Sequence, residues 1–214
     1  MLHDLQTLVG SSVIAADGEI GSVRNFLFDD VSWEVRYLVI NVGNWLKKWD
    51  VIVPITAVEQ PDWAKRIFHV SLTREQVRNS PGADAEKPVV RQQEIAMRDY
   101  FGRLAYWLDG KMGAAPMPTG VKYPLHTKED PHLRSAWDQA GSAVWAADTE
   151  MGRLEGFIIE QASWHIGYLT VKGGSWLQSR LVLIPTGWVK SVSWPSRRID
   201  LLHAGEEQRS SLRG

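Results

Sequence analysis

The chain carries two copies of one sequence pattern, and this duplication most constrains its fold. "SSVIAADGEIGSVRNFLF" in the first half corresponds to "SAVWAADTEMGRLEGFII" in the second. Trp33 corresponds to Trp164. The same difference in residue number relates every other matching residue from Gly10 to Arg66 to its counterpart in the second half. We call this difference the repeat offset. No insertion interrupts this register, so the sequence predicts two copies of one small structural unit.

The pattern within the first copy predicts short β-strands. In "SWEVRYLVINV" the residues Trp33, Val35, Tyr37 and Val39 alternate with polar or opposite-face neighbours. This run is rich in β-branched and aromatic residues, as are the shorter runs "DVIVPI" and "RIFHVSL". Asp17-Gly18 predicts a tight hairpin turn, because glycine tolerates positive φ. These features favour a small, closed or nearly closed antiparallel barrel in each copy.

Helical signals follow the first copy. Thr73 with Gln76 three residues later has the form of a capping box, which predicts a short helix; "HAGEEQRSSLRG" in the second copy has no such cap. "EKPVVRQQEIAMRDYF" predicts a longer helix, and "GKMGAAPMPTGVKYPLHTKEDP" an irregular connector. We therefore expect a first barrel with its short helix over residues 1–81, a helical and Gly/Pro-rich connector over 82–135, a second, more diverged barrel over 136–205, and a frayed tail over 206–214.

Composition excludes several classes of function. The chain has no Cys, which excludes disulfides, thiolate metal sites and thiol catalysis. Its 24 Lys and Arg against 25 Asp and Glu give a net charge of −1, so no long-range attraction to nucleic acid or an anionic membrane is expected. No secretory signal and no membrane-spanning apolar run is apparent in the sequence. We expect a cytoplasmic protein.

Four segments together resemble the PRC-barrel family: "DGEIGSVRNFLFDD", "SWEVRYLVINVGNWL", "VIVPITAV" and "SLTREQVRNSP". The family includes the cytoplasmic domain of the photosynthetic reaction centre H subunit and the C-terminal domain of a ribosome maturation factor. "PVVRQQEIAMRDYFGRLAYW" is similar to the linker that joins two such barrels in bacterial tandem proteins. The resemblance implies an all-β fold of two small PRC-type β-barrels in tandem, joined by a helix and an aromatic irregular connector. It also implies an adaptor that docks onto other macromolecules, with no shared catalytic residues.

Residues that match between the copies are candidates for the structural core, because both copies must solve the same packing problem. The candidates are Trp33, Tyr37, Pro54, Trp164, Tyr168 and Pro185.

A second set is apolar and follows glycine turns at two hairpin tips, where such side chains usually need a covering surface. We assign these residues as a candidate partner-binding site: Trp45, Leu46, Trp49, Trp176 and Leu177. Packing between the barrels or between two copies of the chain is the alternative role.

No motif indicates catalysis. Asp29 and Asp30 fit turn positions better than a cation site, and no two His residues have helical ligand spacing. Catalytic, cofactor and metal residues are therefore assigned as none, and an enzyme ranks last. The leading hypothesis is a non-catalytic interaction or scaffold module with an unknown protein partner, or a homodimer. The alternatives are an RNA- or ribosome-associated factor that uses Lys47, Lys48, Trp49, Arg197 and Arg198, and a peripheral component of a photosynthetic or electron-transport membrane complex.

Overall fold

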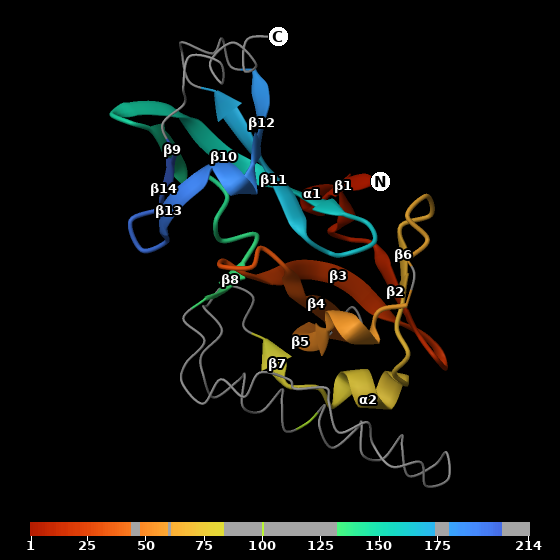
Figure 1. Cartoon of the computed structure of the whole chain (residues 1–214). Coiled ribbons are helices and arrows are strands. Elements are labelled where there is room, and N and C mark those ends of the chain that lie inside the picture. Colours follow the sequence, from red (N-terminus) through yellow and green to blue (C-terminus); the bar gives the residue numbers. More distant parts are fainter. Residues whose placement is uncertain (44–47, 60, 84–99, 101–131, 174–179, 203–214) are drawn as a thin grey trace, which may run out of the picture. The chain divides into compact units, whose positions relative to one another are not determined.

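The computed structural model describes residues 1–43, 48–59, 61–83, 100, 132–173 and 180–202. These residues form two seven-stranded sheets and a few short helices (Figure 1). The fold is all-β, and the prediction of the fold class is confirmed. The predicted longer helix, apart from Tyr100, and the connector as far as residue 131 lie outside the described residues.

The first repeat contributes short strands and helical turns to one sheet, whose strand order is β6-β2-β3-β4-β5-β7, with β8 also paired to β3. The elements along residues 1–83 are β1 Leu2–Asp4, α1 Leu5–Leu8, β2 Ser12–Ala15, β3 Gly18–Asp29, β4 Val35–Gly43, β5 Lys48–Pro54, η1 Ile55–Ala57, β6 Ile67–His69, α2 Arg74–Arg78 and β7 Gly82–Ala83.

The second repeat builds the other sheet, in the order β12-β11-β10-β9-β14-β13, with β1 also paired to β10. The elements along residues 132–202 are β8 Leu133–Ser135, β9 Ala143–Ala146, β10 Thr149–Glu160, β11 Ile166–Gly173, β12 Leu181–Pro185, η3 Thr186–Trp188, β13 Val189–Ser193 and β14 Arg198–Leu201. Among the described residues the pairings run from β12 to β13, and none joins these two end strands.

Each repeat contains one parallel strand pair. β2 pairs in parallel with β6, where Ser12 lies opposite Ile67, and β9 pairs in parallel with β14, where Ala143 lies opposite Arg198. The two pairs have the same register, because both partners are displaced by the repeat offset. The expectation of wholly antiparallel barrels is therefore wrong at this pair, because the chain returns from the far side of each repeat to lie beside its first strand.

The strands that precede the two repeats are exchanged. β1 precedes the first repeat but pairs antiparallel with β10, where Leu2 lies opposite Glu160. β8 precedes the second repeat but pairs with β3, and the Ala136 N–H donates to the Phe26 carbonyl. β1 and β8 are themselves related by the repeat offset, so each takes the equivalent place beside the other repeat.

This exchange is reflected in two compact units. One contains the described parts of residues 1–10, 25–36 and 134–214, and the other contains those of 11–24 and 37–133. β3 and β4 each pass through both units. The predicted barrel boundaries at residues 81, 135 and 205 stay a prediction.

Local signals in the first repeat explain its turns. The Thr73 hydroxyl accepts a hydrogen bond from the Gln76 N–H, and the Gln76 side chain accepts one from the Thr73 N–H, so the predicted capping box is confirmed at the start of α2. The β2–β3 hairpin turns through Ala16 and Asp17, and Gly18 already begins β3 with φ of +129°. The turn thus lies one residue before the predicted position.

One glycine in each repeat lies directly against a neighbouring strand. A Cβ atom at Gly21 would lie 2.1 Å from the Asn41 carbonyl oxygen, and one at Gly152 would lie 2.0 Å from the Lys172 carbonyl oxygen. These distances are far below van der Waals contact, so any larger residue must push two strand backbones apart. The same solution appears at corresponding positions of both repeats, beside an irregularity in the strand register each time.

We expect Gly21→Ala and Gly152→Ala each to destabilise the protein by about 1–3 kcal/mol or more, because the added methyl group overlaps backbone atoms that cannot rotate away. Gly187→Ala is the matched control, since nothing lies within 4 Å of its Cβ position. Urea unfolding measures the free energy of unfolding of all three variants. Equal stability of Gly152→Ala and Gly187→Ala would contradict the close strand approach.

Candidate functional site

Two tight corners, one from each repeat, lie in the first compact unit. In the first corner the Trp33 N–H donates to the Asp29 carbonyl over 2.8 Å, and Trp33 adopts a left-handed φ of 57°. In the second the Trp164 N–H donates to the Glu160 carbonyl over 3.0 Å, and Trp164 has φ of 58°. A bulky residue in this region is strained, so the match shows that both repeats fix the same corner.

The two corners bind each other through reciprocal backbone hydrogen bonds. The Val35 N–H donates to the Trp164 carbonyl over 3.0 Å. The Ile166 N–H donates to the Trp33 carbonyl over 2.7 Å. Glu34 and His165 form an antiparallel bridge between them. The corners are therefore related by an approximate local twofold axis.

An aromatic cluster packs within the same unit. Phe28 is fully buried; its ring stacks on Trp33 with centroids 5.8 Å apart and contacts Phe157 at 5.0 Å. Trp194 meets Phe28 edge-on at 6.1 Å, and its Nε1–H donates to the Asp30 carboxylate. The cluster joins side chains from both repeats into one core.

All six candidate core residues are described and half-buried, and their structural role stays a prediction. Tyr37 lies opposite Pro54 across β4 and β5, and Tyr168 lies opposite Pro185 across β11 and β12. Each proline then stands directly before a short 3-10 helix. The matched pairs therefore occupy equivalent positions in the two sheets.

Of the candidate partner-binding residues, only Trp49 is among the described residues. It lies near the start of β5, opposite Val42 of β4, and is 38% exposed. The other four lie outside the described residues: Trp45, Leu46, Trp176 and Leu177. Partner binding by this set stays a prediction.

The two neighbouring acidic residues are held by basic side chains and by the backbone of the corner. The Asp29 carboxylate accepts the N–H groups of Val31 and Ser32, at 3.0 and 2.8 Å, and pairs with Arg36 at 3.1 Å. Asp30 pairs with Arg134 at 2.9 Å.

These contacts determine how Asp29 titrates. Burial raises the pKa of Asp29, but the N–H groups of Ser32 and Val31 and the charge of Arg36 together hold this pKa below its ordinary value. Asp29 is therefore a charged, structural part of the corner. Among the residues that the structure describes, no group of three or more His, Asp or Glu side chains is arranged to hold a metal ion.

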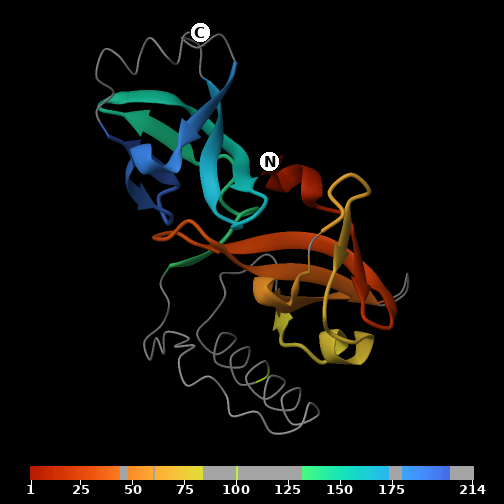
Figure 2. The same cartoon turned by 45° about the vertical axis from the view of Figure 1, so that its right-hand side comes forward.

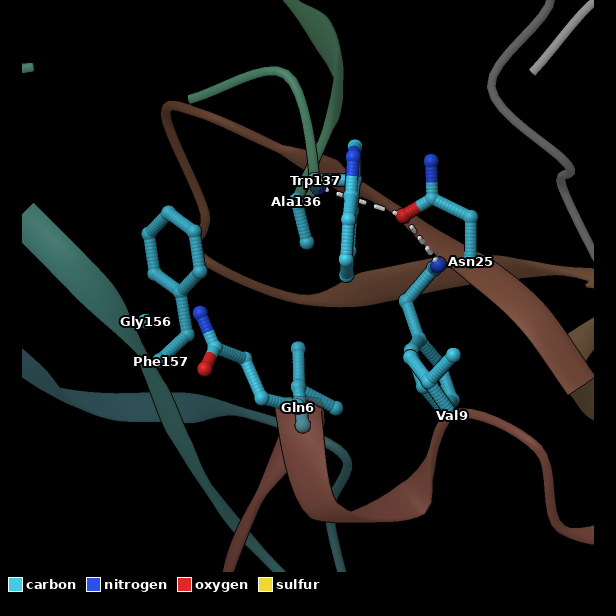
Figure 3. Close-up of a pocket in the computed structure, with 9 residues that line it drawn as sticks. Gln6, Val9, Asn25, Ala136, Trp137, Gly156 and Phe157 are labelled. Carbon is cyan, nitrogen blue, oxygen red and sulfur yellow. Dashed lines mark hydrogen bonds between the residues drawn. The ribbon is translucent and has the colours of Figure 1, made fainter. Parts of the chain in front are cut away.

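A small hollow in the first unit lies beside Trp137, a residue that the sequence analysis did not single out (Figure 3). Trp137 and Phe157 line it together with Gln6 and Val9. Its volume of 20 Å³ is enough for about one water molecule. Organic ligands usually occupy pockets of roughly 300 Å³ or more. The hollow therefore offers no room for a substrate.

Asn25 organises the polar side of this hollow. Its side-chain oxygen accepts the N–H groups of Phe26 and Trp137 (Figure 3). Its Nδ2 donates to the Ser135 hydroxyl over 2.7 Å. Asn25 is 3% exposed, so these bonds satisfy a buried amide. The only sequence signal was a polar residue directly before the apolar run "FLF".

Comparison with known proteins agrees with this geometry. The repeated sheets with matched corners define an all-β protein of duplicated barrel-type units. The model of the PRC-barrel domain matches residues 2–77, so the first repeat is a PRC-barrel domain and the recognition from the sequence is confirmed. An uncharacterized protein of Deinococcus radiodurans is 31% identical over 72 residues, which span 33% of this chain and 26% of that protein. No helix in the described part is long and apolar enough to span a bilayer.

We expect Asp29→Asn to lower the free energy of unfolding near neutral pH by about 1–2 kcal/mol, because it removes the charge that Arg36 faces. The pKa of Asp29 is lowered on folding, so its contribution is complete above the unfolded value of about 3.9 and is lost as the pH falls through the folded value. The difference between wild type and variant should therefore shrink below about pH 4. Urea unfolding over a pH series measures it, and a difference that is constant down to about pH 2 would contradict this role.

We expect Phe157→Ala to lower the free energy of unfolding by about 3–5 kcal/mol, because it removes a buried ring that packs against Phe28 of the aromatic cluster. Trp137→Ala is the comparison, since this indole is 57% exposed and should cost much less. Thermal melts and urea titrations of both variants test the assignment. If Trp137→Ala were the more destabilising change, the cluster would not be the core of this unit.

Proposed function

We propose that the chain is a non-catalytic interaction or scaffold module of the cytoplasm that docks a partner protein. The match of residues 2–77 to the PRC-barrel domain carries the proposal, because resemblance to this family implies an adaptor and not an enzyme. The small volume of the Trp137 hollow supports it. The ion pairs of Asp29 and Asp30 with arginine side chains also support it, because they give both carboxylates a structural role.

We propose the aromatic hairpin tips as the docking surface. Trp49 supports this choice, since it keeps 38% of its surface exposed although it lies in a strand. Large exposed aromatic side chains are frequent energetic centres of protein interfaces. The corresponding tip of the second repeat contributes Trp176 and Leu177 to the proposal.

The arginines considered for RNA binding are engaged within the protein. Arg197 donates to the Ala140 carbonyl. Arg198 pairs with Asp200 at 2.7 Å and lies over the Trp145 ring at 4.4 Å. Phosphate binding would compete with these contacts, so the described geometry favours a protein partner over RNA. Membrane association has only the family analogy behind it.

The test is affinity capture from native cells with wild type and a Trp45→Ala/Trp176→Ala double variant. We expect one specific protein to be recovered with wild type and reduced at least about tenfold with the double variant, because loss of an interface aromatic commonly costs about 1.4 kcal/mol or more.

Trp137→Ala provides the control, since it removes an exposed indole that belongs to neither tip in the sequence. All variants should first give wild-type melting curves. Undiminished capture by the double variant would reject the tips as the docking surface. Capture that is abolished by moderate salt and by nuclease would instead favour RNA.

A further inference from the structure

Strand β12 presents an exposed apolar face and, within the part of the chain that the structure describes, an edge without a paired strand. Leu181 and Leu183 are 61% and 49% exposed, whereas Ile184 on the opposite face is 1% exposed. β12 lies at one end of its sheet, and among the described residues it pairs only with β11 (Figure 1). Edge strands of soluble proteins usually carry charges or are covered, so an apolar edge indicates a binding surface.

The first repeat shows how the equivalent strand is covered. β5 corresponds to β12, and α2 packs against it while β7 pairs antiparallel with its edge (Figures 1 and 2, in yellow). Ile52 occupies the position of Leu183 and is fully buried at 0% exposure. The exposed fraction of the residue at this position therefore differs by about half between the two repeats.

The backbone of β5 shows which groups of β12 a covering segment would pair with. The Ile52 N–H donates to the Pro81 carbonyl over 3.0 Å, and Val51 lies opposite Gly82. The corresponding donor in the second repeat is the N–H of Leu183. Because the two strands have the same register in their sheets, a segment that pairs with β5 has a matching row of partners on β12.

The chain does not repeat the covering sequence at the corresponding positions. Residues 204–214, which lie outside the described part, correspond to residues 73–83 by the repeat offset. Ala204 replaces the capping Thr73, and Gln208 replaces Val77, which is fully buried. Neither the helix cap nor the apolar side chain of the cover is present at the corresponding positions, which favours a cover from another molecule.

Charge adds a requirement for the occupant. In the first repeat Asn41 of β4 donates to Asp50 of β5 across the strands at 2.6 Å. In the second repeat Lys172 and Leu181 occupy these positions, and Lys172 and the neighbouring Arg180 are exposed. A partner segment with acidic side chains would complement this edge.

We propose that β12 is the docking site for an acidic helix–strand segment of a partner protein. A capped helical turn places one apolar side chain on Leu181 and Leu183, and the extended residues after it pair antiparallel with β12. The proposal rests on the function proposed above and adds a surface on β12, the strand that follows the second hairpin tip in the chain. Strand addition of this kind gives affinity through the main chain and specificity through alternate side chains.

The absence of cysteine allows a direct test in the full chain. Leu183→Cys and Ile52→Cys each introduce one thiol at matched positions, and Val31→Cys provides a control at a residue that is 67% exposed. We expect maleimide to label Leu183→Cys at least about tenfold faster than Ile52→Cys, because thiol modification requires access.

The probe for the occupant is a synthetic peptide with the sequence of residues 72–83, LTREQVRNSPGA. A second peptide carries Arg74→Glu and Arg78→Glu, and a third adds Val77→Asp to the second. We expect the acidic peptide to slow labelling of Leu183→Cys at least about fivefold at saturation, more strongly than the unmodified peptide, and to leave Val31→Cys unchanged. The Val77→Asp peptide should have little effect.

Two outcomes would overturn the proposal. Slow labelling of Leu183→Cys without peptide would mean that β12 is already covered; dependence on protein concentration would then indicate a second copy, and recovery after deletion of residues 204–214 would indicate the chain itself. Rapid labelling that neither peptide slows would reject the helix–strand occupant. The labelling experiment changes neither Trp45 nor Trp176. Affinity capture therefore tests the hairpin tips in a separate experiment, and the two proposals can fail independently.

Discussion

The reciprocal hydrogen bonds between the two tryptophan corners hold one of the compact units together. Trp33 and Trp164 each adopt a left-handed conformation that costs a bulky residue about 1–3 kcal/mol. Such strain persists only where the surroundings fix it, and here each carbonyl accepts an N–H from the opposite corner. Phe28 then packs beneath Trp33 and against Phe157, so the backbone contact and the aromatic core reinforce each other.

The duplication explains why much of the fold follows from the sequence. A constant repeat offset predicts equivalent strands, and the parallel pairs β2–β6 and β9–β14 have that equivalence. The capping box at Thr73 could also be predicted from the sequence, because it depends on two residues that are three positions apart. The exchange of β1 and β8 was not readable. The two strands occupy corresponding positions before the two repeats, so local sequence does not distinguish pairing within a repeat from pairing between repeats.

The candidate surfaces were less predictable than the fold for a related reason. Matching residues between repeats identifies what both copies need, which is why the tryptophan and proline pairs were found. A surface that differs between copies gives no such signal. Leu183 and Ile52 are similar apolar residues at equivalent positions, and only their exposed fractions, 49% and 0%, separate them. The proposed site on β12 is therefore recognised from a difference in exposure between equivalent strands, and not from a residue that both repeats share.

The exchanged strands have a consequence for biosynthesis. The Asn25 amide, buried in the folded protein, bonds to Ser135, 110 residues further along the chain. During translation β3 therefore emerges long before the residues that complete it. Such distant contacts slow folding and leave intermediates with open strand edges, which favours chaperone binding or aggregation while the rest of the chain is made. A ribosome that stalls between the repeats would release a fragment with this end of β3 uncovered.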